Sequence, residues 1–382
     1  MDTQDSLFSL FCFFLVCFFS GEQQVVEGRR LPWTSSPFGF RPKMLFVFGD
    51  SYADTGNTKI AETRSWKFPY GITFPGKPSG RFSDGFVSTD YIAGCLGMKT
   101  PIPYRWREQL SERMKDGLNI AYGGTGVFDT MVAEPNMTTQ IDFLQQLLHD
   151  SVYTKRNLKT SVAFVSVAGN DYATYNAKNG SAQDFPAFME SLMNQLRVNL
   201  KRIHDMGVRK IGITSLLPLG CLPRNTAPFS FQHCDDTYNA LVDLHNQLLP
   251  QVVNILNQQT NTSNSPSFFI LDLYNAFWTV FNRNETYQGN DPTFEKPFEP
   301  CCFGVSGGFK CGNVDENGEN KYTLCSDPRS KFFWDGVHPT EQGWYVVYKT
   351  PAFQNSLKQF YGLTSGLCNV YFCFWYLLRS LL

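Results

Sequence analysis

Four short, continuous runs of apolar residues constrain the fold of this chain more than any other feature. They are rich in β-branched and aromatic side chains, and a strand that is buried on both faces shows such an unbroken run. The runs therefore predict central strands of a parallel sheet. They cover residues 44–48, 162–167, 210–214 and 268–271, and residues 118–121 are a candidate fifth, short strand.

Helical patterns occupy the segments between these runs, with leucine and isoleucine recurring on one face. They cover residues 138–148, 186–206, 236–258 and 340–360. The last two contain Pro250 and Pro351, and we expect each proline to kink or split its helix because proline has no amide hydrogen. Alternation of strand and helix implies right-handed crossovers, which predicts a doubly wound α/β sheet.

The two ends of the chain differ from its middle. Residues 1–21 hold an apolar run that is short for a membrane span and is followed by small residues, which is typical of a secretory signal peptide. Asp2 and Asp5 stand where a signal normally carries positive charge, so a signal anchor is the alternative. Residues 364–382 form an apolar extension without the polar spacer of a GPI signal. We expect one domain over residues 43–363 and no stable membrane insertion.

The charge balance disfavours one class of partner. The chain has 33 Lys and Arg against 34 Asp and Glu, for a net charge of −1 with histidine neutral. Proteins that bind nucleic acid usually present a basic surface, and this composition offers none. We therefore expect no nucleic-acid partner.

The eleven cysteines favour export. One candidate pair is Cys221 and Cys234, and a second cluster lies in a loop-rich segment at Cys301, Cys302, Cys311 and Cys325. Their irregular spacing, with no interleaved histidine, argues against zinc and for disulfides, although the connectivity stays open. Sequons for N-glycosylation begin at Asn136, Asn179, Asn261 and Asn284, which fits a secreted glycoprotein.

A serine follows the first predicted strand directly, in the sequence Gly49-Asp50-Ser51. Active sites of open α/β sheets lie at the carboxyl ends of strands, but this serine does not fit the G-x-S-x-G elbow. A serine hydroxyl needs a base to act as a nucleophile, and His338 is the candidate. Asp335, three residues earlier, is placed to accept from its Nδ1–H. A polar turn and an ordinary helix cap are the simpler interpretations of these two segments.

Two polar loops follow other predicted strands. Residues 119–126 include Gly123 and Gly124, which can bring a bare backbone N–H group close to a substrate. Residues 169–171 read Gly-Asn-Asp and set the amide of Asn170 at the same edge of the sheet as the serine. A flexible turn and an Asx-turn are the alternatives.

These four segments, in this order, resemble the plant-type GDSL esterase/lipases of the SGNH hydrolase superfamily, over about residues 45–360. The resemblance implies a single-domain, three-layer α/β/α fold with a mostly parallel, flavodoxin-like sheet, and no cofactor or metal. It further implies that His338 is the base, with Asp335 as its partner. Ser51 would be the nucleophile and an oxyanion donor through its backbone N–H. Gly124, chosen over Gly123, and Asn170 would supply the other two donors.

The expected function is that of a secreted serine ester hydrolase, in the cell wall or apoplast by family resemblance. It would act on a small-molecule or glycan ester (a lipid, an acetylated glycan or a metabolite ester) through an acyl-enzyme. One alternative is an acyltransferase that uses the same residues with an alcohol in place of water. Another is a catalytically silent glycoprotein that binds lipid or carbohydrate. The oligomeric state is left open.

Overall fold

The computed structural model describes residues 42–260, 266–283, 294–306 and 308–361. These residues belong to one compact unit, Phe38–Leu382. The predicted signal peptide, the apolar C-terminal extension and the sequons at Asn261 and Asn284 lie outside the described residues.

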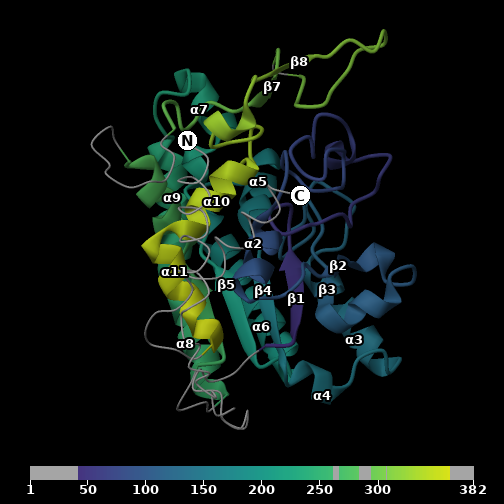
Figure 1. The fold of residues 1–382 in the computed structure, drawn as a ribbon. Coiled ribbons are helices and arrows are strands. Elements are labelled where there is room, and N and C mark those ends of the chain that lie inside the picture. Colours follow the sequence, from purple (N-terminus) through teal and green to yellow (C-terminus); the bar gives the residue numbers. More distant parts are fainter. Residues whose placement is uncertain (1–41, 261–265, 284–293, 307, 362–382) are drawn as a thin grey trace, which may run out of the picture. The chain divides into compact units, whose positions relative to one another are not determined.

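Six parallel strands form the central sheet. They are Met44–Gly49 (β1), Ile102–Pro103 (β2), Gly117–Asn119 (β3), Ser161–Ser166 (β4), Lys210–Thr214 (β5) and Phe268–Leu271 (β6). Their order is β2-β3-β1-β4-β5-β6 (Figure 1). β1 lies between β3 and β4, where Phe46 pairs with Leu118 on one side and with Ala163 on the other. All five pairings are parallel, which confirms the predicted α/β class.

Seven of the ten helices in the described residues pack into two groups. The ten helices are Ser88–Cys95 (α2), Met137–His149 (α3), Lys155–Leu158 (α4), Gly169–Ala177 (α5), Phe185–Asp205 (α6), Pro223–Thr226 (α7), Asp236–Gln259 (α8), Leu273–Phe281 (α9), Glu341–Lys349 (α10) and Pro351–Leu357 (α11). One group contains α3, α6 and α8, and the other contains α2, α9, α10 and α11. The four predicted helical patterns are all present.

The two prolines act differently. The last helical pattern is divided at Pro351, which becomes the first residue of α11. α8 runs through Pro250 without being split. Its buried face continues on both sides of the proline, through Leu249 and Val253, and this packing offsets the one backbone hydrogen bond that proline cannot make.

A small antiparallel ribbon, Cys302–Gly304 (β7) and Tyr322–Leu324 (β8), lies in the loop-rich segment and was not predicted. Disulfides Cys301–Cys325 and Cys302–Cys311 staple it, and a third disulfide joins Cys221 to Cys234. Figure 1 shows the ribbon beyond the end of the sheet toward which β1 points. The cysteines thus fix a segment that has little regular structure of its own.

Candidate active site

The structure brings together three side chains that are far apart in the sequence. The Ser51 Oγ lies 2.8 Å from the His338 Nε2, across a separation of 287 residues. The His338 Nδ1 lies 2.9 Å from the Asp335 Oδ1 and 3.0 Å from its Oδ2. All three residues are buried. This chain of hydrogen bonds is the arrangement by which an imidazole can remove the proton of a serine hydroxyl.

The Asp335 carboxylate is held by several donors. The backbone N–H groups of Val337 and His338 each donate to its Oδ1 at 2.8 Å, and the Tyr70 hydroxyl donates to its Oδ2 at 2.6 Å. Burial by itself would raise the pKa of Asp335. The charge and hydrogen bond of His338, the Arg64 charge and the Tyr70 hydrogen bond outweigh burial and hold this pKa well below its usual range. Asp335 is therefore ionised at neutral pH and can hold the imidazole with its proton on Nδ1.

Aromatic rings enclose the imidazole of His338. The ring of Phe82 lies 5.0 Å from it and the ring of Tyr52 lies 5.6 Å from it, measured between centroids. The Tyr52 hydroxyl also donates to the Val337 carbonyl at 3.1 Å. These contacts hold the imidazole ring between two aromatic side chains.

The turn that carries Ser51 requires glycine at position 49. Gly49 has a φ of +145°, and a Cβ atom there would lie 2.2 Å from the carbonyl oxygen of Ser166 on β4. The side chain of Gln140, from α3, accepts from the Gly49 N–H at 2.8 Å and donates to its carbonyl at 2.9 Å. A buried amide from another element therefore fixes the residue two before Ser51.

The three groups that the family resemblance assigns to the oxyanion lie after neighbouring strands. Ser51 follows β1, Gly124 follows β3, and Asn170 follows β4. Among the described residues, the backbone N–H groups of Ser51 and Gly124 have no hydrogen-bond acceptor. The Asn170 side-chain amide donates to the Thr125 carbonyl at 2.9 Å, which occupies one of its two N–H bonds.

Hydrogen bonding distinguishes the two adjacent glycines of the loop after β3. The Gly123 N–H donates to the Asp54 Oδ2 at 2.9 Å and is therefore occupied. The Gly124 N–H is unoccupied within the described part of the chain, and its φ of +83° is one that glycine adopts readily. Of the two, only Gly124 has a donor to offer an oxyanion.

A strained residue precedes Asn170. Ala168 caps the N-terminus of α5 with a φ of +88°, a left-handed conformation that costs a non-glycine residue about 1–2 kcal/mol. The conformation makes the sharp turn from β4 into α5. The packed surroundings therefore stabilise a turn that places an amide side chain at the carboxyl edge of the sheet.

Residues 45–349 match the GDSL-like Lipase/Acylhydrolase family. The chain belongs to this family. Membership confirms the fold class and the expected class of enzyme, a carboxylic ester hydrolase.

Named relatives of this GDSL protein match it over most of their length. GDSL esterase/lipase At5g03610 of Arabidopsis thaliana is 54% identical and covers 89% of this chain and 94% of its own. GDSL esterase/lipase At3g09930 of the same plant is 50% identical over 91% of this chain and 97% of its own. Acetylajmalan esterase 2 of Rauvolfia serpentina is 30% identical over 82% of this chain and 91% of its own.

Solved structures resemble the GDSL protein only weakly. Axe2, an acetylxylan esterase from Geobacillus stearothermophilus, aligns over 84% of this chain and 96% of its own. The two chains are 13% identical, with a TM-score of 0.37. A likeness of this size carries no argument about the substrate.

Two features of the site had no signal in the sequence. Tyr70 and Gln140 lie in segments without a recognisable motif, yet Tyr70 donates to the Asp335 carboxylate and Gln140 holds Gly49 in the turn before Ser51. Their partners are distant along the chain, 265 residues away for Tyr70 and 91 residues away for Gln140. Only the folded topology brings them to the site.

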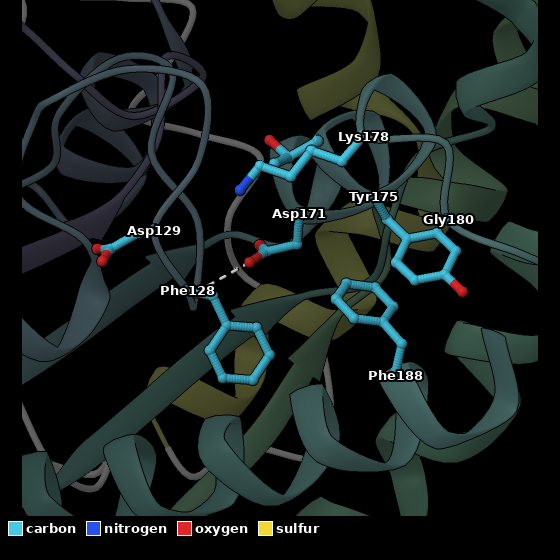
Figure 2. Close-up of a pocket in the computed structure, with 8 residues that line it drawn as sticks. Phe128, Asp129, Asp171, Tyr175, Lys178, Gly180 and Phe188 are labelled. Carbon is cyan, nitrogen blue, oxygen red and sulfur yellow. Dashed lines mark hydrogen bonds between the residues drawn. The ribbon is translucent and has the colours of Figure 1, made fainter. Parts of the chain in front are cut away.

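A cavity of about 220 Å³ lies beside the loop that follows β3 (Figure 2). Its lining consists of Phe128, Asp129, Asp171, Thr174, Tyr175, Lys178, Gly180 and Phe188. In Figure 2 the Asp171 carboxylate accepts from the Phe128 N–H, at 2.9 Å. Asp171, which directly follows Asn170 in the sequence, thus lines this cavity together with three aromatic rings.

Within the described ranges, no group of three or more His, Cys, Asp or Glu side chains could hold a metal ion. The helices in those ranges also include none with the length and apolarity needed to cross a bilayer.

Two of the four sequons fall in described residues. Asn136 caps α3, where its side-chain oxygen accepts from the Thr139 N–H at 3.0 Å and its amide donates to Asp129 at 2.7 Å. Asn179 is exposed just after α5. Glycosylation at both positions stays a prediction, and Asn179 is the more accessible acceptor.

Asp50, between Gly49 and Ser51, is a buried carboxylate. Its pKa is raised from 3.8 to about 7, chiefly by burial; the hydrogen bond from the Tyr52 N–H opposes this rise, and the charge of the nearby Asp171 carboxylate adds to it. The folded protein thus favours the protonated form of this group.

Replacing Asp50 with asparagine should stabilise the fold more at pH 7 than at pH 4.5. Because the folded pKa is raised, the contribution of Asp50 to stability is present at low pH and is lost as the pH rises toward 7. Asparagine does not titrate, so the difference in unfolding free energy between variant and wild type should grow by up to about 1.4 kcal/mol per pH unit. Urea denaturation at the two pH values measures this difference, and equal differences would contradict the account.

Proposed function

We propose that this protein hydrolyses carboxylic esters through an acyl-enzyme on Ser51, with His338 as the general base and Asp335 as its partner. The observation that carries this proposal is the 2.8 Å hydrogen bond between the Ser51 Oγ and the His338 Nε2. The second nitrogen of that imidazole is bound to an ionised, buried carboxylate, so the two nitrogens have distinct roles.

The proposed reaction has two halves. Ser51 Oγ attacks the ester carbonyl while His338 Nε2 takes the serine proton. The resulting oxyanion accepts hydrogen bonds from the N–H groups of Ser51, Gly124 and Asn170. The C–O bond then breaks, and His338 returns the proton to the leaving alcohol. Water repeats the sequence on the acyl-enzyme, which releases the acid and restores the serine hydroxyl.

The disulfides fit an extracellular protein, because such bonds persist in oxidising compartments. We therefore propose a secreted enzyme that meets small-molecule or glycan esters outside the cell, in the cell wall or apoplast. The named relatives include an esterase for an acetylated metabolite, Acetylajmalan esterase 2.

Membership of the family does not by itself guarantee turnover. One relative, 28% identical over 88% of this chain, is named Inactive GDSL esterase/lipase-like protein 23 of Arabidopsis thaliana. The connected hydrogen bonds from Ser51 to His338 to Asp335 support an active enzyme over a silent binding protein.

The test is turnover of p-nitrophenyl acetate by the purified protein and by a Ser51→Ala variant. We expect hydrolysis by the wild type and none above background by the variant, with an unchanged circular dichroism spectrum. Ser161→Ala is a matched control, because Ser161 is also buried and lies at the opposite end of β4 from the site. Full turnover by Ser51→Ala would refute the assignment of the nucleophile.

A further inference from the structure

We propose that Tyr70 is a positioning residue of this hydrolase, which keeps the Asp335 carboxylate aimed at the His338 imidazole. The inference rests on the proposed roles of Asp335 and His338. It starts from one hydrogen bond, in which the Tyr70 hydroxyl donates to the Asp335 Oδ2 at 2.6 Å, with both residues buried.

The two oxygens of Asp335 are held in different ways. Its Oδ1 accepts from the N–H groups of Val337 and His338, two and three residues further along the same loop. Its Oδ2 accepts from the Tyr70 hydroxyl, and within the described part of the chain its only other partner is the imidazole itself. The loop alone thus supports one side of the carboxylate. The other side depends on a residue 265 positions away.

Tyr70 is fixed by a satellite core that is separate from the main one. Its members are Tyr70, Cys301, Cys302, Cys311, Tyr322 and Trp334. The Tyr70 ring lies 5.9 Å from the Trp334 ring and 6.5 Å from the Phe82 ring, between centroids, and Trp334 directly precedes Asp335. Two disulfides close this core. The phenol therefore has a defined place against the carboxylate.

Backbone pairing ties the ribbon to the same loop. The Cys301 N–H donates to the Phe333 carbonyl at 2.9 Å, and the Cys302 N–H donates to the Trp334 carbonyl at 2.7 Å. The satellite core thus positions both partners of the 2.6 Å bond, Tyr70 through its ring and Asp335 through the residues before it.

The electrostatics suit a fixed donor. Burial and the Asp335 charge both raise the pKa of Tyr70 well above its usual value, so its hydroxyl keeps its proton. The other charged or titratable groups that act on Asp335 are His338 and Arg64, and Tyr52 lies near enough to feel its charge. Apart from the imidazole itself, Tyr70 is the one described side chain that donates a hydrogen bond to the oxygen that the backbone leaves free.

The test is a Tyr70→Phe variant, which keeps the ring and removes only the hydroxyl. Loss of a hydrogen bond to a buried charge should lower kcat for p-nitrophenyl acetate about tenfold with little change in KM. A carboxylate that has lost this donor holds the protonated imidazole more strongly. The acidic limb of the pH profile of kcat/KM should therefore move to higher pH by about half a unit or more.

Tyr153→Phe is the matched control. Tyr153 is also buried, and its hydroxyl donates to the Met114 carbonyl at 2.9 Å. Its loss should lower the melting temperature and leave the pH profile unchanged. If Tyr70→Phe behaves like this control, the inference is wrong and Tyr70 has a structural role only.

The wild type and Ser51→Ala separate this inference from the proposed function. A wild type that turns over ester, a Ser51→Ala variant that does not, and an unaltered pH profile in Tyr70→Phe would overturn the role of Tyr70 alone. Ester turnover that survives Ser51→Ala would overturn the proposed function itself.

Discussion

Replacing His338 with alanine should lower kcat for p-nitrophenyl acetate by about 10⁴-fold or more. The variant removes the only base that is hydrogen-bonded to the Ser51 hydroxyl among the described residues. Without it, the nucleophile stays protonated and the leaving alcohol receives no proton. Steady-state kinetics with the purified variant measures the loss.

The His338 ring also packs between Tyr52 and Phe82, so alanine leaves a void. His338→Gln is the second variant, since it fills more of the space and cannot act as a base. Both variants should lose activity to a similar extent while retaining a cooperative thermal transition. A kcat within tenfold of wild type in either folded variant would contradict the role of His338.

Replacing Asn170 with alanine should lower kcat about 10²–10³-fold with a small change in KM, because an oxyanion donor acts mainly in the transition state. One N–H of the Asn170 amide is bound to the Thr125 carbonyl, which orients the side chain and leaves the other N–H for the proposed bond to the oxyanion. Asn170→Asp keeps the size but has no N–H, so it should lose at least as much activity.

Asn257→Ala is the control for the loss of an amide. The Asn257 side chain, like that of Asn170, bonds to the backbone: it accepts from the Phe268 N–H at 3.0 Å and donates to the Phe268 carbonyl at 2.8 Å. Phe268 is the first residue of β6 and so lies at the amino ends of the strands, whereas Asn170 follows the carboxyl end of β4. This variant should lose stability and keep its kcat. A wild-type kcat in the Asn170→Ala variant would show that Asn170 does not donate to the oxyanion.

The strands that the sequence predicts are those that are buried on both faces. Residues 44–48 and 162–167 became β1 and β4, whose side chains are almost entirely buried, so the apolar run itself carries the signal. β2 has only two residues, Ile102 and Pro103, at the edge of the sheet. A strand this short has no periodicity to detect, and only its pairing with β3 defines it.

The candidate groups that sit in motifs could be predicted from the sequence, because each motif follows a predicted strand or spans a few residues. Ser51 and the pair Asp335 and His338 are of this kind. Tyr70 and Gln140 act through single contacts across the fold, so no local pattern indicates them. The sequence favours Gly124 over Gly123 only through the family resemblance, and the structure adds a physical reason, since the Asp54 carboxylate occupies the Gly123 N–H.

The disulfide pairing is another feature that the folded structure shows and the sequence does not. Four clustered cysteines allow three connectivities, and the sequence does not choose among them. The ribbon selects one connectivity, because the pairing of β7 with β8 places Cys301 beside Cys325. Cys302 then bonds with Cys311 in the intervening loop.

The location of a fluorophosphonate adduct tests the central claim most directly. These probes phosphonylate a serine that a neighbouring base has activated, so peptide mass spectrometry of the labelled wild type reports the nucleophile itself. We predict stoichiometric modification of the peptide that contains Ser51, and strongly slowed labelling of the His338→Ala variant. An unmodified Ser51 in protein that turns over ester, or an adduct on a different serine, would contradict the account.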